Sequence, residues 1–285
     1  MKLSGYIIEK YDNMSGSYTC HRLVDEAKAL GFSIDIIGAN DCLITEEGII
    51  NRGRILEQRD FVINRYKWGK TKQALNMLAR KSYNDISIFN CYVNKFEQMT
   101  RLQSSYFLKP LYCLSTTSLQ YEELTARLGT PFVAKGLENS MGREIALITN
   151  RQEYQSLKEN YAAEKEWLFE EYIATSYGRD LRLYSIRGEA IACIMRQSND
   201  GFRANMALGA TATPVTIDKC LKEIAKDIYR QTELDFVGID LLFGHKEYYL
   251  CEINVMPGLE GVETATGTNI AREMLLMIKK DFENE

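Results

Sequence analysis

Two apolar segments near the end of the chain, FVGIDLLF and YYLCEINV, each contain an acidic residue where a core side chain is expected. These residues are Asp240 and Glu252, and Asn254 follows Glu252 by two positions. Because side chains alternate across a strand, Glu252 and Asn254 share one face. If Gly244 pairs with Tyr248 around a three-residue loop, Asp240 lies directly opposite Glu252, with the Cβ atoms about 5 Å apart. The spacing therefore predicts that three oxygen ligands converge.

Two carboxylates at this separation need a counter-charge. They repel each other by about 4 kcal/mol at an effective dielectric constant of roughly 20, and the apolar neighbours Ile239, Leu241 and Ile253 limit access of water. Hard oxygen donors without His or Cys suit Mg²⁺ or Mn²⁺, and magnesium completes its shell with water and phosphate oxygens. Two other interpretations stay open at this point: a solvated hairpin face, or a register shifted by one residue so that the acids point apart.

A metal and phosphate site also needs cationic side chains. Lys95 follows the first α/β region, and Lys135 ends the apolar segment PFVAK, where a lysine can act as a point charge against phosphate oxygens. Arg182 in GRDLRLYS and Arg203 in GFRAN suit a bidentate grip on a carboxylate or a transferring phosphoryl group. Each of these residues, taken singly, is also compatible with an ordinary surface position.

Hydrophobic periodicity predicts an α/β unit followed by an α+β unit. The first ninety or so residues alternate expected strands and helices, and no G-x-G-x-x-G motif occurs among them. Strands are expected at residues 6–8, 33–37, 61–64 and 86–89, with a helix at about 71–81 and another at 95–104. Later segments are mostly strand pairs, with amphipathic helices near 217–229 and through Ile270, Met274 and Ile278.

Composition excludes several classes of protein. The chain has 285 residues, of which 45% are apolar and 26% charged, and its formal net charge is -4, so an ordinary folded protein is expected. Lys and Arg are dispersed, which argues against a nucleic-acid partner. The cysteines form no C-x-x-C, which disfavours a zinc cluster or a disulfide framework, and no run of eighteen apolar residues suggests a membrane span or export. We therefore expect a cytoplasmic protein with reduced thiols.

Several motifs together resemble the ATP-grasp superfamily, and within it the RimK-type α-L-glutamate ligase branch. The resemblance covers about residues 94–280, in matching order and approximate spacing. The motifs that carry it are Asn94-Lys95, VAKGLENSMGREI, LFEEYI, GRDLRLYSI, FRANMALGA, VGIDLL and CEINVMPGLEGVETATGTNIA. The resemblance implies an ATP-grasp fold that combines α/β and α+β parts. It divides the chain into a Rossmann-like pre-ATP-grasp domain at 1–93, an N-terminal ATP-grasp subdomain at 94–170 and a C-terminal subdomain at 171–285.

The resemblance also implies how ATP would be bound between the two subdomains. It places Lys95 and Lys135 on the phosphates, and Arg182 and Arg203 as catalytic residues around the acyl phosphate. The flexible phosphate loop corresponds to Glu138 to Glu144, which has one glycine where the family has several. The further roles that it implies are phosphate-loop contacts for Ser140 and Gly142, adenine contacts for Glu171 and Tyr172, a ribose contact for Asp180, triphosphate contacts for Arg203 and Asn205, and two metal ions, Mg²⁺ or Mn²⁺, held by Asp240, Glu252 and Asn254.

The function implied is an ATP-dependent carboxylate–amine ligase that forms an acyl phosphate and adds glutamate or a related amino acid to a peptide, protein or small molecule. Alternatives are a glutathione-synthetase-like enzyme, a coenzyme glutamyl ligase or a peptide-modifying enzyme. An ATP-binding scaffold without turnover is disfavoured, because the expected metal ligands and arginines are all present. The family resemblance is compatible with a homo-oligomer, and the identity of the acid and amine is not encoded in a readable motif.

Overall fold

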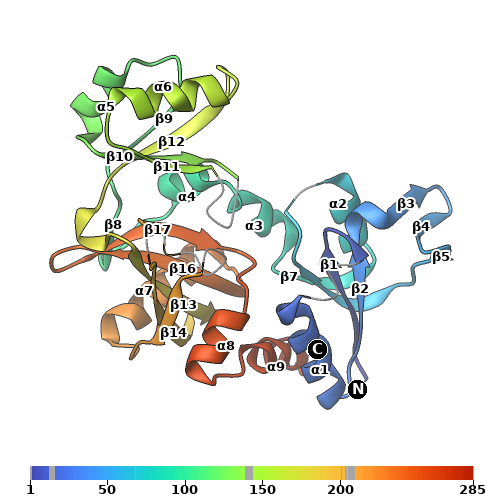
Figure 1. The fold of residues 1–285 in the computed structure, drawn as a ribbon. Helices are drawn as coiled ribbons and strands as arrows, with labels where there is room; N and C mark the ends of the chain where they lie inside the picture. Colours follow the sequence, from blue (N-terminus) through green and yellow to red (C-terminus); the bar gives the residue numbers. More distant parts are fainter. Residues whose placement is uncertain are drawn as a thin grey trace.

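The computed structural model describes residues 2–12, 17–67, 69–138, 144–199, 201–202, 204 and 209–284. These residues form three bodies (Figure 1). One body contains the N-terminal strands, one contains β9 to β12 with two helices, and the third is built on the largest sheet. The domain boundaries expected at residues 93 and 170 stay a prediction.

The first body is a parallel four-stranded sheet with the order β2-β1-β6-β7. The two central strands, β1 and β6, contain continuous buried runs because both of their faces are covered. Ile7 and Phe61 face the core that includes helices α1 and α9, whereas Ile8 and Val62 face the core beneath α2. The elements of this body are β1 (Ser4–Glu9), α1 (Tyr18–Ala29), β2 (Ser33–Gly38), η2 (Ala39–Asp41), β6 (Arg59–Asn64), α2 (Lys70–Asn76) and β7 (Ala79–Tyr83), with a small antiparallel sheet of β3 (Cys42–Thr45), β4 (Gly48–Asn51) and β5 (Arg54–Ile55).

The prediction of a strand at residues 86–89 was wrong. This segment is helix α3 (Ile86–Cys91), because the Asp85 side chain caps it by accepting hydrogen bonds from the backbone N–H groups of Ser87 and Ile88. The helix expected at 71–81 ends earlier, at Asn76, and the last strand of the sheet is β7. Short apolar runs are ambiguous between helix and strand, and here the cap decides.

The second body is the antiparallel sheet β11-β10-β12-β9, covered on one face by two helices. Trp167 and Phe169 of β12 pack into the core with these helices, whereas Leu168 lies in the core of the largest sheet. The strand alternation therefore turns Leu168 and Glu170 toward the third body. The elements are β9 (Tyr112–Thr116), α5 (Tyr121–Leu128), β10 (Phe132–Gly136), β11 (Ile145–Ile148), α6 (Arg151–Asn160) and β12 (Glu166–Glu171).

The third body is a six-stranded sheet with the order β15-β14-β13-β16-β17-β8. Helix α7 lies along it, and Leu221, Ile224 and Ile228 of the predicted stripe are buried. Ile217, the fourth residue of that predicted stripe, precedes the helix and is half-buried. The elements are α4 (Lys95–Arg101), β8 (Phe107–Leu108), η3 (Ala174–Ser176), β13 (Arg179–Ile186), β14 (Glu189–Gln197), β15 (Thr211–Pro214), α7 (Lys219–Thr232), β16 (Phe236–Phe243), β17 (Tyr248–Asn254), α8 (Glu260–Thr266) and α9 (Ile270–Glu283).

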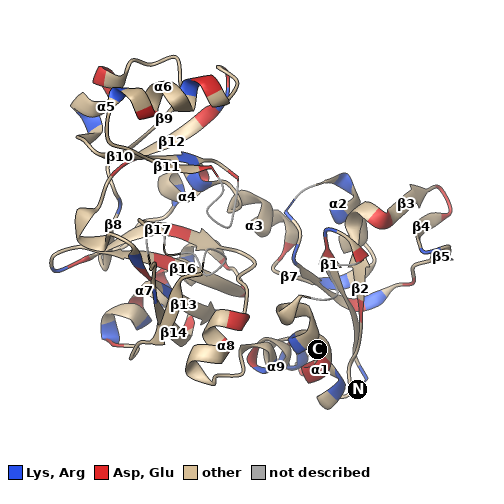
Figure 2. Cartoon of the chain, in the orientation of Figure 1, with Lys and Arg blue, Asp and Glu red and all other residues tan. Residues whose placement is uncertain are grey.

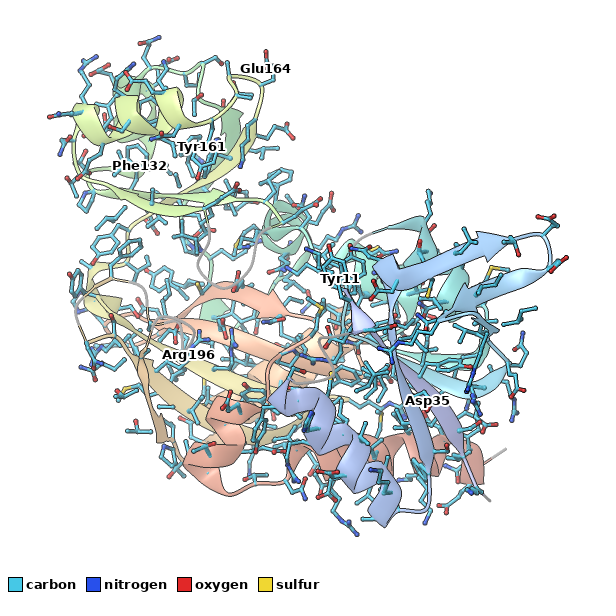
Figure 3. The ribbon with its side chains drawn as sticks, turned by 45° about the vertical axis from the view of Figure 1, so that its right-hand side comes forward. Tyr11, Asp35, Phe132, Tyr161, Glu164 and Arg196 are labelled. Atoms are coloured by element: carbon cyan, nitrogen blue, oxygen red, sulfur yellow. The ribbon has the colours of Figure 1, made fainter. Side chains whose placement is uncertain are left out.

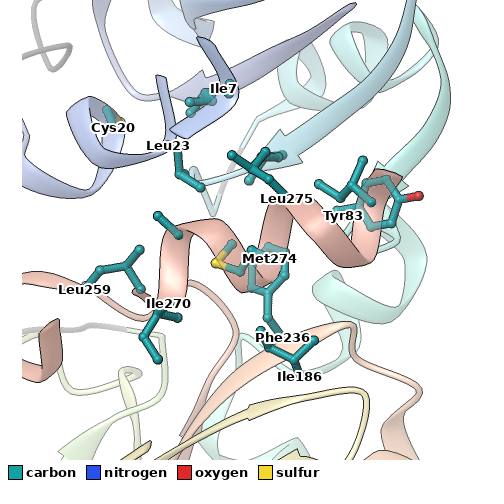
Figure 4. Close-up of a cluster of buried hydrophobic side chains, with 14 of the residues drawn as sticks. Ile7, Cys20, Leu23, Tyr83, Ile186, Phe236, Leu259, Ile270, Met274 and Leu275 are labelled. Atoms are coloured by element: carbon teal, nitrogen blue, oxygen red, sulfur yellow. The ribbon is translucent and has the colours of Figure 1, made fainter. Parts of the chain in front are cut away.

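The C-terminal helix α9 joins the first and third bodies. Its predicted stripe Ile270, Met274 and Ile278 is buried in one core that also contains Ile7 of β1 and Phe236 of β16 (Figure 4). The two bodies therefore share apolar packing, and the end of the chain closes onto its beginning.

Positively and negatively charged residues are interspersed along the chain in all three bodies (Figure 2). This distribution agrees with the dispersed Lys and Arg residues of the sequence. Among the helices that the structure describes, none combines the length and apolar character needed to cross a membrane.

Helix α9 offers a matched test of the shared core. Ile278→Ala should lower the free energy of unfolding by about 2–5 kcal/mol, because a fully buried side chain leaves a cavity. Leu276→Ala, at a position of the same helix that is 37% exposed, should have a much smaller effect. Urea denaturation of both variants provides the comparison, and equal losses would contradict the docking of α9.

Candidate functional site

The hairpin of β16 and β17 brings together two of the predicted carboxylates. Asp240 lies directly opposite Glu252, which confirms the predicted pairing of the two acids. Gly238 lies opposite Asn254. The predicted turn was wrong: Phe243, not Gly244, pairs with Tyr248, and the backbone N–H of Gly244 donates to the carbonyl of Glu247 within the loop. An irregularity after Asp240 compensates for this shift.

The apolar residues between the oxygen-bearing side chains define the opposite face of the hairpin. Ile239, Leu241 and Ile253 are buried in the core beneath α7. Because side chains alternate, Asp240 and Glu252 point away from that core. The alternative in which the two acids point to opposite sides of the sheet is therefore wrong.

Two buried amides hold these strands in position. The side chain of Gln98 in α4 donates to the Ile253 carbonyl at 3.0 Å and accepts from the Ile253 N–H at 2.8 Å. Asn84 makes the corresponding pair of bonds to Phe236 and also donates to the carbonyl of Val255. Buried polar groups that are fully paired fix one arrangement, so the backbone beside Glu252 is tied to segments outside the sheet.

Asp240 is the centre of a buried charge cluster with two arginines. Its Oδ1 and Oδ2 accept hydrogen bonds from Arg182 at 2.6 and 2.5 Å, and Arg196 adds a third bond at 3.0 Å. Arg196 also grips Asp180 in a bidentate manner at 2.7 and 2.6 Å. Burial alone would raise the pKa of Asp240, but the charges of Arg182 and Arg196 outweigh it and hold that pKa below its usual value.

Arg196 was missed by the sequence reasoning. It lies in the largest sheet (Figure 3) and its side chain is only 3% exposed. A signal was available, because Arg196 follows the apolar run EAIACIM, where a charge needs a buried partner. Both carboxylate oxygens of Asp180 accept hydrogen bonds from Arg196. The ribose contact expected for Asp180 stays a prediction.

Lys135 occupies the facing sheet of the second body. Its Nζ lies 2.7 Å from Glu170 Oε2 and donates to the carbonyl of Cys251 at 3.3 Å, so it contacts both sheets. Burial favours the neutral amine, but the acidic groups of Cys251 and Glu170 outweigh it and raise the pKa of Lys135 above its usual value. Glu170 Oε1 is buried and has no hydrogen-bond partner among the residues that the structure describes.

Glu170 is a second residue that the sequence reasoning missed. The family resemblance implied an adenine contact for the next residue, Glu171. Glu171 is half-buried at the end of β12, beside the half-buried Tyr172. Because Leu168 faces the third body, the period-two alternation of β12 would have identified Glu170 as the residue on the same face.

The second predicted lysine lies beside the hairpin. Lys95 Nζ is 3.4 Å from Glu252 Oε2, and the lysine side chain is buried whereas that of Glu252 is 24% exposed. Lys67, from the loop between β6 and α2, lines the same crevice as Lys95, Glu252 and Asn254. Burial and the charge of Lys95 lower the pKa of Lys67 to about 8.

A cavity of about 990 Å³ adjoins the arginine cluster. Arg182, Arg196 and Tyr184 line it from the largest sheet, and Tyr18 and Thr19 line it from the first body. Helix α8, Gly258 before it and residues 210–212 complete its wall. The Tyr184 hydroxyl donates a hydrogen bond to the Gly258 carbonyl at 2.7 Å. The cavity is large enough for a small organic substrate.

The oxygen donors of the hairpin fit a divalent cation. Among the described residues no group of three His, Cys, Asp or Glu side chains forms a metal site, so two carboxylates and the Asn254 amide are the available protein donors. An ionised carboxylate offers about four lone-pair positions, and Asp240 uses three of them on arginines. Mg²⁺ in nucleotide sites is usually bound by few protein oxygens, and water and phosphate oxygens complete its shell.

Four of the predicted site residues lie outside the described residues. These are Ser140, Gly142, Arg203 and Asn205, and their expected roles stay predictions.

Comparison with known proteins identifies both family and fold relatives. A family model described as RimK-like ATP-grasp domain matches residues 93–278. The chain is 29% identical over 277 residues to a "Probable alpha-L-glutamate ligase" of Enterobacter sp. (strain 638), with 92% of each chain covered.

Two solved structures share the fold at low sequence identity. One is the ATP-grasp ligase PsnB complexed with minimal precursor, Mg and ADP, with a TM-score of 0.67, 13% identity and coverage of 97% of this chain and 96% of the other. The other is D-alanine–D-alanine ligase from Bacillus anthracis complexed with ATP, with a TM-score of 0.66, 15% identity and coverage of 98% and 96%.

The arginine cluster can be tested by stability. Arg196→Met should lower the free energy of unfolding by about 3–5 kcal/mol, because it leaves the buried carboxylate of Asp180 without its counter-charge and removes one of the three bonds to Asp240. Adding Asp180→Asn should restore part of the loss, since the charge of Asp180 is then removed. Arg230→Met, at a side chain 63% exposed on α7, is the control and should change little. A urea midpoint for Arg196→Met equal to that of the unchanged protein would contradict the cluster.

Proposed function

The chain belongs to the RimK-like ATP-grasp family and is an ATP-dependent carboxylate–amine ligase, and on this premise we propose that it activates its acid as an acyl phosphate. The expected ATP-grasp fold is confirmed by the solved structures that resemble it. ATP-grasp ligases use ATP and Mg²⁺. Our proposal concerns which residues perform the reaction and which acid and amine are joined.

One observation carries the proposal: two sheets present matched charges to each other. Lys135 and Glu170 lie on the facing side of the second body, and Asp240 and Glu252 lie on the hairpin of the third. Lys135 spans the gap through the Cys251 carbonyl. A nucleotide tail between these sheets would meet lysine on one side and metal-binding oxygens on the other, which is the environment that phosphoryl transfer requires.

The reaction has two balanced steps. An oxygen of the substrate carboxylate attacks the γ-phosphorus of ATP, the bond to the β-phosphate oxygen breaks, and ADP leaves. The amine then attacks the acyl carbon, loses a proton, and displaces inorganic phosphate to form the amide. Positioning and charge stabilisation supply most of the rate, and no protein nucleophile is needed.

We assign the residues of the described site as follows. Lys95 and Lys135 bind phosphate oxygens, Arg182 faces the acyl phosphate and the tetrahedral oxyanion from the wall of the cavity, and Arg196 keeps Arg182 and Asp240 in register. Glu252 and Asn254 are the direct metal ligands, with one free lone-pair position left on Asp240. When bound, Mg²⁺ offsets the charge of the phosphate oxygens.

The finer assignments follow the family pattern. Two metal ions are proposed, with Mn²⁺ as a substitute for Mg²⁺, since oxygen donors accept both. Glu171 and Tyr172 at the end of β12 are proposed for adenine and Asp180 for ribose. Ser140, Gly142, Arg203 and Asn205 are proposed for the phosphates, with Arg203 also acting on the acyl phosphate.

For the substrate, we propose transfer of glutamate or a related amino acid to a peptide, protein or small-molecule acceptor. The name of the Enterobacter relative supports glutamate, and a structure of PsnB complexed with precursor peptide PsnA2 and AMPPNP supports a peptide. The cavity of about 990 Å³ has room for either. All seven cysteines are free thiols, which supports the cytoplasm as the location. Action as one subunit of a homo-oligomer is compatible with this assignment.

The acyl phosphate is tested by isotope transfer. A screen of ADP release over amino acids and peptides, with mass spectrometry of the product, first identifies the substrates. With ¹⁸O in the carboxylate of the acid so identified, one label should appear in the released phosphate. Label that stays entirely in the product and unreacted acid would contradict the proposed intermediate.

The proposed metal ligand Glu252 is tested by a near-isosteric substitution. Glu252→Gln should reduce ADP release by at least about 100-fold, because it removes the charge that binds the cation but retains the side-chain shape. Glu247→Gln, in the turn of the same hairpin, should retain turnover. Thermal unfolding should show that both variants are folded. Turnover near that of the unchanged protein in Glu252→Gln would remove this residue from the metal site.

A further inference from the structure

The first body contributes a lysine to the crevice beside the proposed metal ligands Glu252 and Asn254. Lys67 is half-buried, and its Nζ donates to the carbonyl of Glu138 at 3.1 Å, so the side chain reaches from the first body to the end of β10. The crevice of about 20 Å³ that it lines also includes Lys95, Glu252 and Asn254. A phosphate group is larger than this crevice, so it would sit at the mouth and not inside.

The backbone of Lys67 is held by another lysine that is itself buried. Lys72 of α2 is 1% exposed, and its Nζ donates to the Lys67 carbonyl and to Asn90 Oδ1, both at 3.0 Å. The ammonium group also lies 4.0 Å from the centre of the Phe89 ring. Burying a lysine without a carboxylate is costly, and its pKa is lowered to about 8 by that burial. The hydrogen bond from Lys72 therefore fixes the backbone position of Lys67.

The charges around the crevice favour an anion. Lys67 and Lys95 bring two ammonium groups to this crevice, whose lining contains one carboxylate, Glu252. The carboxylates of Glu138 near Lys67 and of Glu170 near Lys95 lie outside the lining. If Glu252 binds a cation, as proposed above, its charge no longer balances the two lysines. A phosphate oxygen at the mouth of the crevice would then supply the counter-charge.

The direction from which Lys67 enters indicates which phosphate it meets. Lys135 is buried between the second and third bodies, whereas Lys67 comes from the first body. The first body also supplies Tyr18 and Thr19 to the cavity proposed for the acid. The phosphate nearest to that cavity is the one that is transferred.

We propose that Lys67 binds the γ-phosphoryl group of ATP, so that the first body participates directly in phosphoryl transfer. This inference rests on the proposed ligase site and adds to it a residue from outside the region that matches the family model, residues 93–278. Lys72 is a positioning residue that acts through Lys67.

The test compares ATP with ADP, which differ by the γ-phosphoryl group alone. Lys67→Met should weaken ATP binding about tenfold in calorimetry with Mg²⁺ present, and should leave the affinity for ADP within about twofold. Lys67→Arg should recover most of the ATP affinity, because it restores the charge. Lys70→Met is the matched control, since Lys70 is an exposed lysine three residues away, and it should change neither affinity.

A parallel variant separates this inference from the proposed function. Lys135→Met should weaken ATP binding if the ligase site is correct. Loss with Lys135→Met but unchanged ATP affinity with Lys67→Met would overturn the role of Lys67 and leave the ligase site intact. Equal losses of ATP and ADP affinity with Lys67→Met would overturn the assignment to the γ-phosphoryl group. Unchanged ATP binding in both variants would contradict the phosphate site and this inference together.

Discussion

Buried carboxylates must be matched by cations, and this constraint organises the centre of the molecule. Asp180, Asp240 and Glu170 are each at most 8% exposed, and every one of them has an arginine or lysine within 3 Å. Such pairs contribute little net stability, because the cost of removing both charges from water offsets their attraction. Their value lies in geometry, since the bidentate Arg182–Asp240 and Arg196–Asp180 pairs fix the orientation of the two aspartate side chains.

The first and third bodies are also held together by buried amides and by a shared apolar core. The strands that carry Asp240 and Glu252 receive hydrogen bonds from the buried amides of Asn84 and Gln98, which lie outside the sheet. Helix α9 shares a core with the first body, so the N-terminal region is packed against the third body by apolar contacts as well. If the cavity lined by these two bodies holds the substrate, as proposed, catalysis needs this registration, because small displacements of reacting groups are costly in rate.

Much of the site was predictable because strand alternation is a strong local rule. The opposition of Asp240 and Glu252 followed from an acidic residue in each of two apolar strands, although the turn itself was misread because an irregularity in the ladder leaves no sequence signal. The helix at 86–89 was mistaken for a strand, since a four-residue apolar run carries both periods. Partnership could not be predicted: that Arg196 joins Asp180 to Asp240 depends on the order β14-β13-β16, which is a tertiary property.

We propose, as the central point, that the half-buried side chains of Glu252 and Asn254 on the β16–β17 hairpin anchor the metal of a nucleotide held by lysines. The most direct measurement is the anomalous diffraction of Mn²⁺ in a crystal grown with a non-hydrolysable ATP analogue. We predict a manganese peak roughly 2.0–2.6 Å from oxygens of Glu252 and Asn254, with the phosphates between it and Lys135. A manganese peak away from this hairpin, or triphosphate density outside the gap between the two sheets, would contradict the account.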